Sequence, residues 1–451
     1  QATRLDHRVV AEEDCVRRDQ RHAGGHGVGP GAGLEGCFSR GEVDAGIHAE
    51  QLGFIGAYRL GRKSPRARQG DHVEVYGLGF VGLTLGVALA GRGHFVTGID
   101  TNGLLVEQLL AGEPQVFEPR LPEMMRRAMN DNQLVFRNAP GDEHHRVVVI
   151  AVGTPVADDG SASLGALQTV CETVGPRLKR GDLVMLRSTV PVGITRGFVR
   201  ELLEAGSGLK AGEAFHLAFT PERTVEGQAM QELTSLPQIV GGLSSRCAEL
   251  ASAFWQTLTD SVVRVDNLEA AELVKLINNS YRDLSFAFSN GLALLADRFN
   301  LDATRIIAAA NDGYPRNPIP RPSPGVGGYC LTKDPFLYAA VDCEAGHGQL
   351  SCHGRMVNEE AGRYPVQLVS RFAERLGRPL SGLCVLLVGI AFKGWPETND
   401  LRGSTGVNVG LELVRQGCEV MVYDAVVDDA ALQALGFMPV TPHDAAGRCD
   451  A

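Results

Sequence analysis

The sequence has no long apolar run and no excess of basic residues, and each absence removes a class of protein. No apolar stretch approaches the ~20 residues that a membrane-spanning helix needs. Lys and Arg total 43 against 53 Asp and Glu, a formal net charge of -10. Proteins that neutralise nucleic-acid phosphates instead cluster Lys and Arg. We therefore expect no membrane span and no nucleic-acid partner.

Cysteine occurs ten times but never as a Cys-x-x-Cys pair. Thiols scattered over a chain of this length are typical of a reducing compartment, and we expect no signal peptide ahead of the body of the chain. Cys343, His347, Cys352 and His353 are close in sequence, but their spacing matches no standard zinc module. The sequence thus predicts a cytoplasmic protein without a metal.

The composition is that of a soluble protein with two to three domains. Of 451 residues, 44% are apolar and 21% are charged. Residues 1–70 differ from the rest, because Gly, Arg and His dominate and no helical or strand period holds. Such a segment buries too little surface to offset chain entropy. We predict that it is disordered or a non-native extension.

An α/β pattern begins at Val73. Val73–Tyr76 is typical of a strand, an apolar helix follows to about Arg92, and a second strand, Phe95–Ile99, ends in Asp100. Between the first strand and the helix stands a glycine-rich turn, Gly77-Leu-Gly79-Phe80-Val81-Gly82. This order of elements predicts a dinucleotide-binding Rossmann unit. Because no Lys or Arg follows Asp100 closely to pair with a 2'-phosphate, the pattern favours NAD over NADP.

Further strands each end in a polar, turn-rich loop. The strands are Val147–Val152, Leu183–Leu186 and about Leu217–Phe219, and the loops are Gly153–Pro155, Ser188–Gly193 and Thr220–Gly227. In open parallel sheets, ligands bind beyond the carboxyl ends of the strands. We therefore expect these loops to share one crevice with the cofactor.

Residues from Leu268 to about Asn300 predict one long helix rich in Ala, Leu and Phe. Lys275 and Asn279 are four residues apart and share a face of it. Two interpretations stay open: a solvated edge, or a cation and an amide donor aimed at a developing oxyanion. A helix this apolar exceeds what one small domain covers, so we also expect a homodimer or higher homo-oligomer.

The stretch Pro324–Pro335 places a thiol behind a glycine turn, after the proline-rich irregular loop Asn311–Ser323. The glycines let the backbone approach a ligand closely. Cys330 follows them, with Lys333 and Asp334 at short spacing. A nearby cation stabilises a thiolate, which is a strong nucleophile. Alone, the pattern fits a packing cysteine as well as a nucleophile.

A last α/β pattern follows helical segments that end near Leu376. Cys384–Val388 and Glu419–Tyr423 are typical of strands, with a helix at Val407–Arg415 between them. This is short for a Rossmann-type sheet, and an incomplete sheet leaves an unpaired edge. We predict a partial domain and weakened binding of its ligand.

Together these motifs resemble those of the UDP-glucose/GDP-mannose dehydrogenase family, the nucleotide-sugar 6-dehydrogenases. The resemblance runs from about Val73 to Pro439 and rests on Gly77–Gly82, Ser188–Gly193, Thr220–Gly227, Lys275–Asn279, Gly327–Asp334 and Lys393–Ser404. It implies an α/β chain with an N-terminal Rossmann NAD-binding domain (71–265), a central all-helical domain with one long helix (266–376) and a partial C-terminal Rossmann-like UDP-sugar-binding domain (377–451).

The resemblance also implies roles for individual residues. NAD would contact Gly77, Gly79, Phe80, Val81, Gly82, Asp100, Thr154, Thr189, Glu226, Lys333 and Arg402. The UDP-sugar would contact Glu222, Arg223, Glu226, Lys275, Asn279, Ile319, Arg321, Ser323, Gly327 and Lys393. Cys330 would be the nucleophile, Lys275 and Asn279 would stabilise oxyanions, and Asp334 would act as general base or position water, helped by Thr189 and Glu222.

For such an enzyme, oxidising a C6 alcohol to the acid removes two hydrides and consumes two NAD in turn. The Cys330 thiolate would capture the intermediate aldehyde as a thiohemiacetal, and a second oxidation would give a thioester that water hydrolyses.

The substrate and some rival functions stay open. Leu331–Pro335, Pro221–Arg223 and Leu236–Gln238 resemble the branch that acts on UDP-N-acetylhexosamines (UDP-N-acetylmannosamine or UDP-N-acetylglucosamine), which would supply surface polysaccharide precursors. The alternatives are a UDP-glucose 6-dehydrogenase, a two-electron hydroxyacid dehydrogenase that needs no cysteine, and an inactive truncated sugar-nucleotide-binding fragment.

Overall fold

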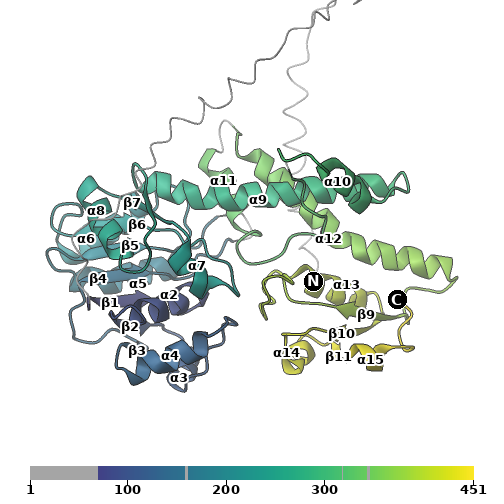
Figure 1. Ribbon diagram of the computed structural model, residues 1–451, viewed down its shortest axis with the longest axis horizontal. Coiled ribbons are helices and arrows are strands. Elements are labelled where there is room, and N and C mark those ends of the chain that lie inside the picture. The colour runs from purple at the N-terminus through teal and green to yellow at the C-terminus, as the bar shows by residue number, and fades with distance from the viewer. Residues whose placement is uncertain (1–69, 158–160, 317, 343–345) are drawn as a thin grey trace, which may run out of the picture. The chain divides into compact units, whose positions relative to one another are not determined.

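The computed structural model describes residues 70–451 except 158–160, 317 and 343–345, and Figure 1 shows their arrangement. The disorder or extension predicted for residues 1–70 therefore lies almost wholly outside the described residues. The strands are β1 His72–Tyr76, β2 Phe95–Ile99, β3 Leu134–Arg137, β4 Val147–Ile150, β5 Leu183–Leu186, β6 His216–Phe219, β7 Gln238–Gly242, β8 Val262–Arg264, β9 Cys384–Val388, β10 Glu419–Tyr423 and β11 Met438–Pro439.

The helices run between and beyond these strands. They are α2 Phe80–Ala90, α3 Gly103–Leu110, α4 Leu121–Asn130, α5 Gly165–Val174, α6 Arg200–Ser207, α7 Ala229–Ser235, α8 Ser245–Trp255, α9 Leu268–Asp297, α10 Ala303–Asn311, α11 Asp334–Ala339, α12 Gln349–Arg375, α13 Thr405–Arg415, α14 Asp429–Ala434 and α15 Pro442–Ala445. The described residues also form three shorter helical segments. Two are 3-10 helices, η1 Gly175–Arg177 and η3 Ala340–Asp342, and one is a π-helix, η2 Thr195–Val199.

In the described part of the chain, β1 to β8 form one sheet in the order β3-β2-β1-β4-β5-β6-β7-β8. All neighbours are parallel except β6 and β7, which are antiparallel. The α/β fold class is confirmed. The sequence analysis had not identified β3, β7 and β8, so the sheet is wider than predicted.

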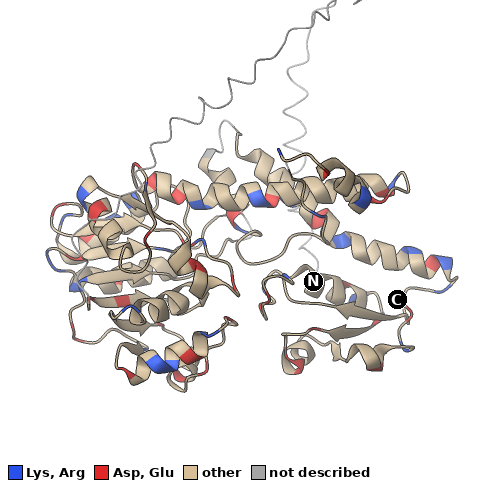
Figure 2. Cartoon of the chain, in the orientation of Figure 1, with Lys and Arg blue, Asp and Glu red and all other residues tan. Residues whose placement is uncertain are grey.

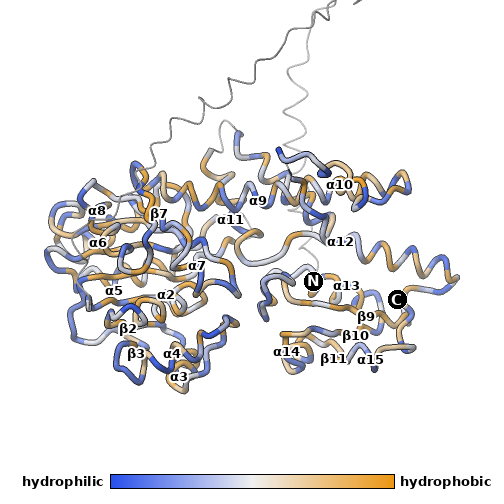
Figure 3. Tube along the Cα trace, viewed as in Figure 1, coloured by the Kyte–Doolittle hydropathy of each residue, from blue (hydrophilic) through white to orange (hydrophobic). Residues whose placement is uncertain are grey.

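Both faces of this sheet are buried, as its nearly continuous Val, Ile and Leu strands require. One apolar cluster joins Val73 and Val149 to helix α2 and to α8, and the other joins Val148 and Ile150 to α5 and α6. Helix α2 is buried from Gly82 to Ala90 because it also packs against α4 and α7. Figure 3 shows the apolar colour of α2 and the central strands.

Helix α9 is the longest helix among the described residues, at 30 residues or about 45 Å. Asn267 caps it, its side-chain oxygen accepting from the Ala270 N–H at 2.8 Å. The helix begins against β7 and continues beside α11, α10 and α12, as Figure 1 shows. It therefore links the NAD-binding sheet to the helical segment that carries the Cys330 turn.

A buried polar network joins α9 to α12. Arg355 donates to Asp283 Oδ1 at 2.8 Å and to the Val326 carbonyl at 3.3 Å. Asn358 donates to Asp283 Oδ1 at 2.9 Å and accepts from Asn290 at the same distance. This network ties the loop ahead of Cys330 to both helices.

The C-terminal strands form a second parallel sheet, ordered β11-β10-β9. The sequence analysis predicted an unpaired edge here, and for β9 this is wrong. The Leu386 N–H donates to the Ala451 carbonyl at 2.9 Å, and the Ala451 N–H donates to the Cys384 carbonyl at 3.2 Å. The last residues of the chain therefore pair with the Cys384–Leu386 part of this edge, and Val388 at the far end of β9 stays exposed.

Charged residues of both signs are interspersed over the described elements, as Figure 2 shows. Within this part of the chain, none of the helices combines the length and the apolar character that crossing a bilayer requires.

Candidate active site

The glycine turn after β1 lies where the strand order reverses, between β1 and β4. Gly77 has φ +89°, and a Cβ there would lie 2.8 Å from the Ala151 carbonyl oxygen. A Cβ on Gly82 would lie 1.8 Å from the Gly77 carbonyl oxygen, whereas a Cβ on Gly79 would meet nothing within 4 Å. Two glycines are thus required by the chain's own packing, and the third faces open space at the place where a dinucleotide's pyrophosphate approaches.

Asp100 is held against this turn. Its Oδ2 accepts from the Leu78 N–H at 2.8 Å and its Oδ1 from the Asn102 N–H at 2.9 Å. Phe80 and Val81 form the first turn of α2 and are half-buried. The acid at the end of β2 is therefore fixed beside the start of α2, in the position that recognises a ribose.

The loops after β4 and β5 are joined at the same edge. The Thr154 hydroxyl donates to the Thr189 carbonyl, and the Ser188 hydroxyl donates to the Val152 carbonyl at 2.7 Å. Thr154 and Thr189 therefore lie in contact at the carboxyl ends of these two strands.

Glu272, which the sequence analysis did not single out, anchors the second of these loops to α9. Its carboxylate accepts from the Gly193 N–H at 2.6 Å, the Thr195 N–H at 2.9 Å and the Thr195 hydroxyl at 2.5 Å. Burial raises the pKa of this carboxyl, while the same donors lower it.

Lys275, Asn279, Cys330 and Asp334 come together, and we call them the thiol cluster. Lys275 is only 6% exposed, which excludes the interpretation of this face as a solvated helix edge. Asn279 Nδ2 donates to Asp334 Oδ2 at 2.5 Å, and the Asp334 N–H donates to the Cys330 carbonyl at 2.9 Å. Asn279 thus holds Asp334 through its side-chain amide.

The environment of the Cys330 thiol differs from the expected one. Cys330 is accessible to solvent, yet packed protein surrounds it, and this desolvation raises its pKa. Lys275 is the strongest influence that lowers the pKa, ahead of Lys333. The sequence pointed to Lys333, but its Nζ is 2.9 Å from Asp334 Oδ1 in an ion pair.

Glu222 pairs with Arg187, which, like Glu272, the sequence analysis did not single out. Arg187 is 1% exposed and donates to Glu222 Oε2 at 3.0 Å from Nε and 2.5 Å from Nη2. Glu222 Oε1 accepts from the backbone N–H groups of Arg223 and Thr224, each at 2.7 Å. Desolvation raises the pKa of Glu222, but Arg187 and these donors more than offset it. Both Glu222 oxygens are therefore held within the loop that follows β6.

Glu226, Lys393, Asp400 and Arg402 form a second group, the bridging cluster, between residues far apart in sequence. Lys393 Nζ donates to the Glu226 carbonyl at 2.5 Å. Arg402 Nη2 is 2.6 Å from Asp400 and 3.5 Å from Glu226 Oε1. Burial and the Asp400 charge raise the pKa of Glu226.

Tyr329 links the two clusters and was missed by the sequence analysis. The Arg402 guanidinium carbon lies 5.2 Å from its ring centroid and the Lys333 Nζ lies 5.6 Å from it. Cations favour the face of an aromatic ring, so the residue beside the thiol also contacts two of the residues assigned to NAD.

The glycines before Cys330 allow close contact with the C-terminal segment. A Cβ on Gly327 would lie 2.5 Å from the Gly403 carbonyl oxygen, and one on Gly328 would lie 2.7 Å from the Phe392 ring. The Gly328 N–H donates to the Gly403 carbonyl at 3.3 Å. Gly327 is therefore needed for packing, whichever ligand it contacts.

The remaining residues assigned to the sugar are more scattered. The Asn311 side-chain amide donates to the Ile319 carbonyl and accepts from the Ile319 N–H, both at 2.9 Å. The Ser323 N–H donates to Asn290 Oδ1 at 2.8 Å. Arg223 Nη2 donates to the Pro237 carbonyl at 2.5 Å. Arg321 is exposed and has no hydrogen bond or ion pair to another described residue.

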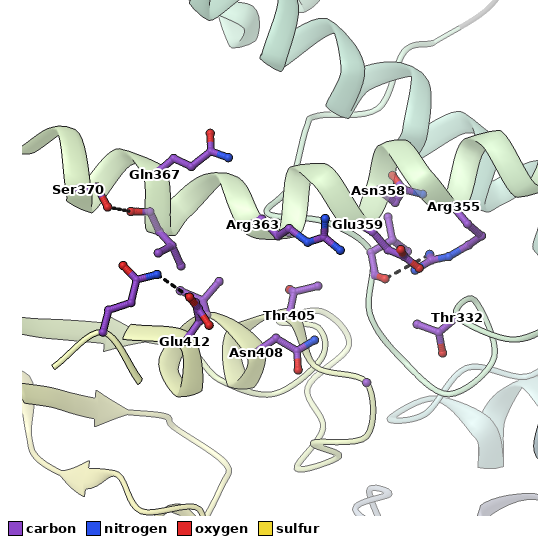
Figure 4. A pocket seen from close by; sticks show the side chains of 16 residues that line it. Thr332, Arg355, Asn358, Glu359, Arg363, Gln367, Ser370, Thr405, Asn408 and Glu412 are labelled. Carbon is purple, nitrogen blue, oxygen red and sulfur yellow. Dashed lines mark hydrogen bonds between the residues drawn. The ribbon is translucent and has the colours of Figure 1, made fainter. Parts of the chain in front are cut away.

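A cavity of about 750 Å³ lies between α12 and α13, and Figure 4 shows its lining. Val326 and Thr332 of the Cys330 loop contribute to it, together with Arg355, Asn358 and Asn408. No member of the thiol or bridging cluster lines it, although Thr332 and Gly403 of its lining are sequence neighbours of Lys333 and Arg402.

Comparisons with protein-family models and with known proteins match one enzyme family. The NAD binding domain of the UDP-glucose/GDP-mannose dehydrogenase family matches residues 71–259, and the central domain of that family matches residues 269–359. UDP-N-acetyl-D-mannosamine dehydrogenase of Yersinia pestis is 33% identical over 352 residues, covering 75% of this chain and 81% of that protein.

Two solved structures are similar over most of the chain. UDP-D-ManNAc dehydrogenase of Pyrococcus horikoshii has a TM-score of 0.74 at 29% identity, covering 79% of this chain and 84% of that one. A UDP-glucose dehydrogenase of Pyrobaculum islandicum also has a TM-score of 0.74, at 32% identity, covering 85% and 89%. On these domain matches and this relative, the chain belongs to the UDP-glucose/GDP-mannose dehydrogenase family and is an NAD-dependent oxidoreductase.

Proposed function

We propose that this chain oxidises the C6 alcohol of a UDP-sugar to the uronate in two successive oxidations at Cys330. The observation that carries the proposal is the thiol cluster, in which an accessible thiol lies beside a buried ammonium and a fixed carboxylate. A two-electron hydroxyacid oxidation needs no nucleophile, so an accessible thiol here favours the four-electron reaction.

When bound, NAD accepts the hydride in each oxidation. The open side of Gly79 suits its pyrophosphate, and Asp100 suits its ribose hydroxyls. Thr154 and Thr189 would extend the same site, with Lys333 and Arg402 around Tyr329. Because the Asp100 carboxylate would repel a 2'-phosphate, we propose a strong preference for NAD over NADP.

Lys275 would act on the substrate oxygen. Its Nζ has no hydrogen bond to another described residue, although the side chain is almost fully buried. An ammonium with free protons in a site of low dielectric stabilises an alkoxide or a tetrahedral oxyanion strongly. The proximity that lowers the pKa of Cys330 also places this ammonium near the carbon that the sulfur attacks.

Cys330 would carry the acyl group. Its sulfur bonds to the aldehyde carbon, and the proton lost from the thiol passes through a base to the carbonyl oxygen, giving a thiohemiacetal. Loss of a hydride and of that hydroxyl proton gives the thioester. Water then adds to the thioester carbonyl and the carbon–sulfur bond breaks, which forms the uronate and restores the thiol.

Asp334 would orient the water of the last step. It is fully buried, and Asn279 and Lys333 hold its two oxygens. A carboxylate fixed from both sides has little freedom to turn away from the acyl carbon. Thr189 would assist, whereas Glu222 would act indirectly by shaping its loop around Arg187.

The bridging cluster would hold the sugar nucleotide and close the site. Lys393 and Glu226 bring the third and first domains together. Gly327 and the loop through Ile319, Arg321 and Ser323 would contact the UDP part, and the Arg321 guanidinium has no partner among the described residues.

We propose UDP-N-acetylhexosamine as the substrate. Relatives that act on UDP-N-acetyl-D-mannosamine support this, although the UDP-glucose dehydrogenase of Pyrobaculum islandicum is just as similar in structure. The test is NADH release from UDP-N-acetylmannosamine, UDP-N-acetylglucosamine and UDP-glucose, compared by kcat/KM. A higher value for UDP-glucose would overturn the substrate assignment and leave the reaction type in place.

We also propose a homodimer formed along α9. Ile277, Tyr281, Phe288 and Leu295 are 41%, 75%, 64% and 51% exposed. At about 100° per residue their spacings of four and seven place all four within about 40° of one face. Such a stripe is typical of a helix–helix interface. Phe288→Asp should convert a dimer to a monomer in light scattering, and a monomeric parent protein would contradict the proposal.

A further inference from the structure

Two thiols of the C-terminal domain are in contact. Cys384 is the first residue of β9 and is buried, while Cys449 lies in the last segment and is half-buried. Their sulfur atoms are 3.8 Å apart and both are reduced. A disulfide bond brings two sulfurs to about 2.05 Å. A small rotation of either side chain would bring these two sulfurs to that distance.

The backbones of these two cysteines are held together independently of the sulfurs. The Asp450 N–H donates to the Cys384 carbonyl at 2.7 Å, and the Cys384 N–H donates to Asp450 Oδ2 at 3.0 Å. Arg378 binds the other Asp450 oxygen at 2.6 Å. This reciprocal clamp holds Asp450, and with it the neighbouring Cys449, beside the first residue of β9.

We propose that Cys384 and Cys449 form an intramolecular disulfide when the protein meets a small-molecule disulfide such as oxidised glutathione. The Cys449 thiolate attacks one glutathione sulfur, and the other glutathione leaves as a thiolate that takes up a proton. The Cys384 thiolate then attacks Cys449 Sγ in the mixed disulfide and releases the second glutathione. Two protein thiols are oxidised and one glutathione disulfide is reduced.

The order of attack follows from the surroundings of the two thiols. Cys449 is partly open to solvent, so a glutathione molecule can reach it. Burial and the neighbouring Cys449 raise the pKa of Cys384 to about 11. Cys384 is therefore the weaker nucleophile toward solvent, but it is already beside the sulfur that it must attack.

The bond would close a loop from β9 through β10, β11 and α15, which is the whole C-terminal sheet. Lys393 and Arg402 of the bridging cluster lie within that loop. Cross-linking mainly restricts the unfolded chain, so it should raise stability without moving the folded residues. Both cysteines lie at the start of β9 or beside it, whereas the bridging cluster follows the far end of that strand.

The test is to incubate the full-length protein with oxidised glutathione and to map its disulfides by mass spectrometry. We expect a Cys384–Cys449 peptide pair, which identifies the link even if Cys330 is also modified. Oxidation should raise the melting temperature by roughly 5 °C or more, reversed by dithiothreitol, with kcat after re-reduction unchanged.

Cys449→Ser should abolish both the linked peptide and the thermal shift. Cys418→Ala is the matched control, because Cys418 is buried in the same domain and its thiol donates to the Leu380 carbonyl. It should retain the linked peptide and the shift. A parent protein without the linked peptide, or with the link but no thermal shift, would overturn the proposal.

Discussion

The thiol cluster and the bridging cluster lie around one tyrosine but differ in how the chain holds them. The thiol cluster comes from residues 275–334, and its Asp334 and Lys275 are 0% and 6% exposed. The bridging cluster joins Glu226 to residues 393–402, and the Arg402 side chain is 58% exposed. The residues to which we assign the chemistry thus lie in one packed segment, whereas the residues to which we assign ligand binding depend on contact between segments.

This difference suggests how substitutions should divide. Losses in the thiol cluster should lower kcat, because they remove interactions that matter at the reacting carbon. Losses in the bridging cluster should mainly raise KM, because they weaken the binding of NAD or sugar alike in ground and transition states.

Cys330→Ser should produce the largest effect. A serine hydroxyl is far harder to ionise near neutral pH than a thiol, so formation of the uronate should fall by about a thousandfold or more. The measurement is uronate production by chromatography of the sugar products. Cys418→Ala is the control and should leave the rate unchanged. A serine variant that turns over like the parent would make Cys330 a packing residue.

Lys275→Met should have the next largest effect. Removing the buried ammonium while keeping its length should lower kcat by roughly 10²- to 10³-fold, with little change in KM. Lys210→Met is a matched control, because Lys210 is exposed and pairs with Glu204. If KM rises and kcat is kept, Lys275 belongs functionally with the bridging cluster and the comparison fails.

Arg402→Ala should have a smaller effect of a different kind. The KM for NAD should rise by about tenfold, the size of one lost charge-assisted contact, and kcat should stay within about twofold. Arg415→Ala removes an exposed arginine of the same domain that pairs with Glu412, and it should change neither constant. A kcat loss as large as that of Lys275→Met would contradict the division between the clusters.

The smallest expected effect is on the pH dependence of the rate at which the Cys330 thiol is alkylated. Desolvation raises its pKa above the ordinary value of 9.0, so the thiolate fraction should still be increasing as pH rises through 9. Alkylation by iodoacetamide should accelerate over that range. Because Lys275 lowers this pKa, Lys275→Met should move the alkylation profile to higher pH. A shift to lower pH would show that Lys275 does not stabilise the thiolate.

The sequence predicted the parts of the site that are encoded locally. The turn Gly77–Gly82, the acid Asp100 and the pair Lys275 and Asn279 are recognisable because a few neighbouring residues set their geometry. The strands β1, β2, β4 and β5 were predicted for the same reason, since each is a short apolar run bounded by turns.

The rest depends on contacts between distant residues. Glu222 meets Arg187 across 35 positions, and Glu272 meets Thr195 across 77. No local pattern marks Arg187 as a buried cation or Tyr329 as a ring between two charges. For Arg187 the available signal was a charged residue at the end of an otherwise apolar strand, β5, where a buried partner is required. The edge pairing of β9 was missed because it joins residues more than 60 positions apart, mostly through backbone groups.

The central claim, that Cys330 carries the acyl group of a four-electron oxidation, is tested most directly by stoichiometry. Limiting UDP-sugar should be converted completely with excess NAD, and NADH should be counted against uronate formed. The account predicts two NADH for each sugar and no free aldehyde, because the aldehyde is held as a thiohemiacetal. One NADH for each sugar, with the carbonyl compound released, would contradict it.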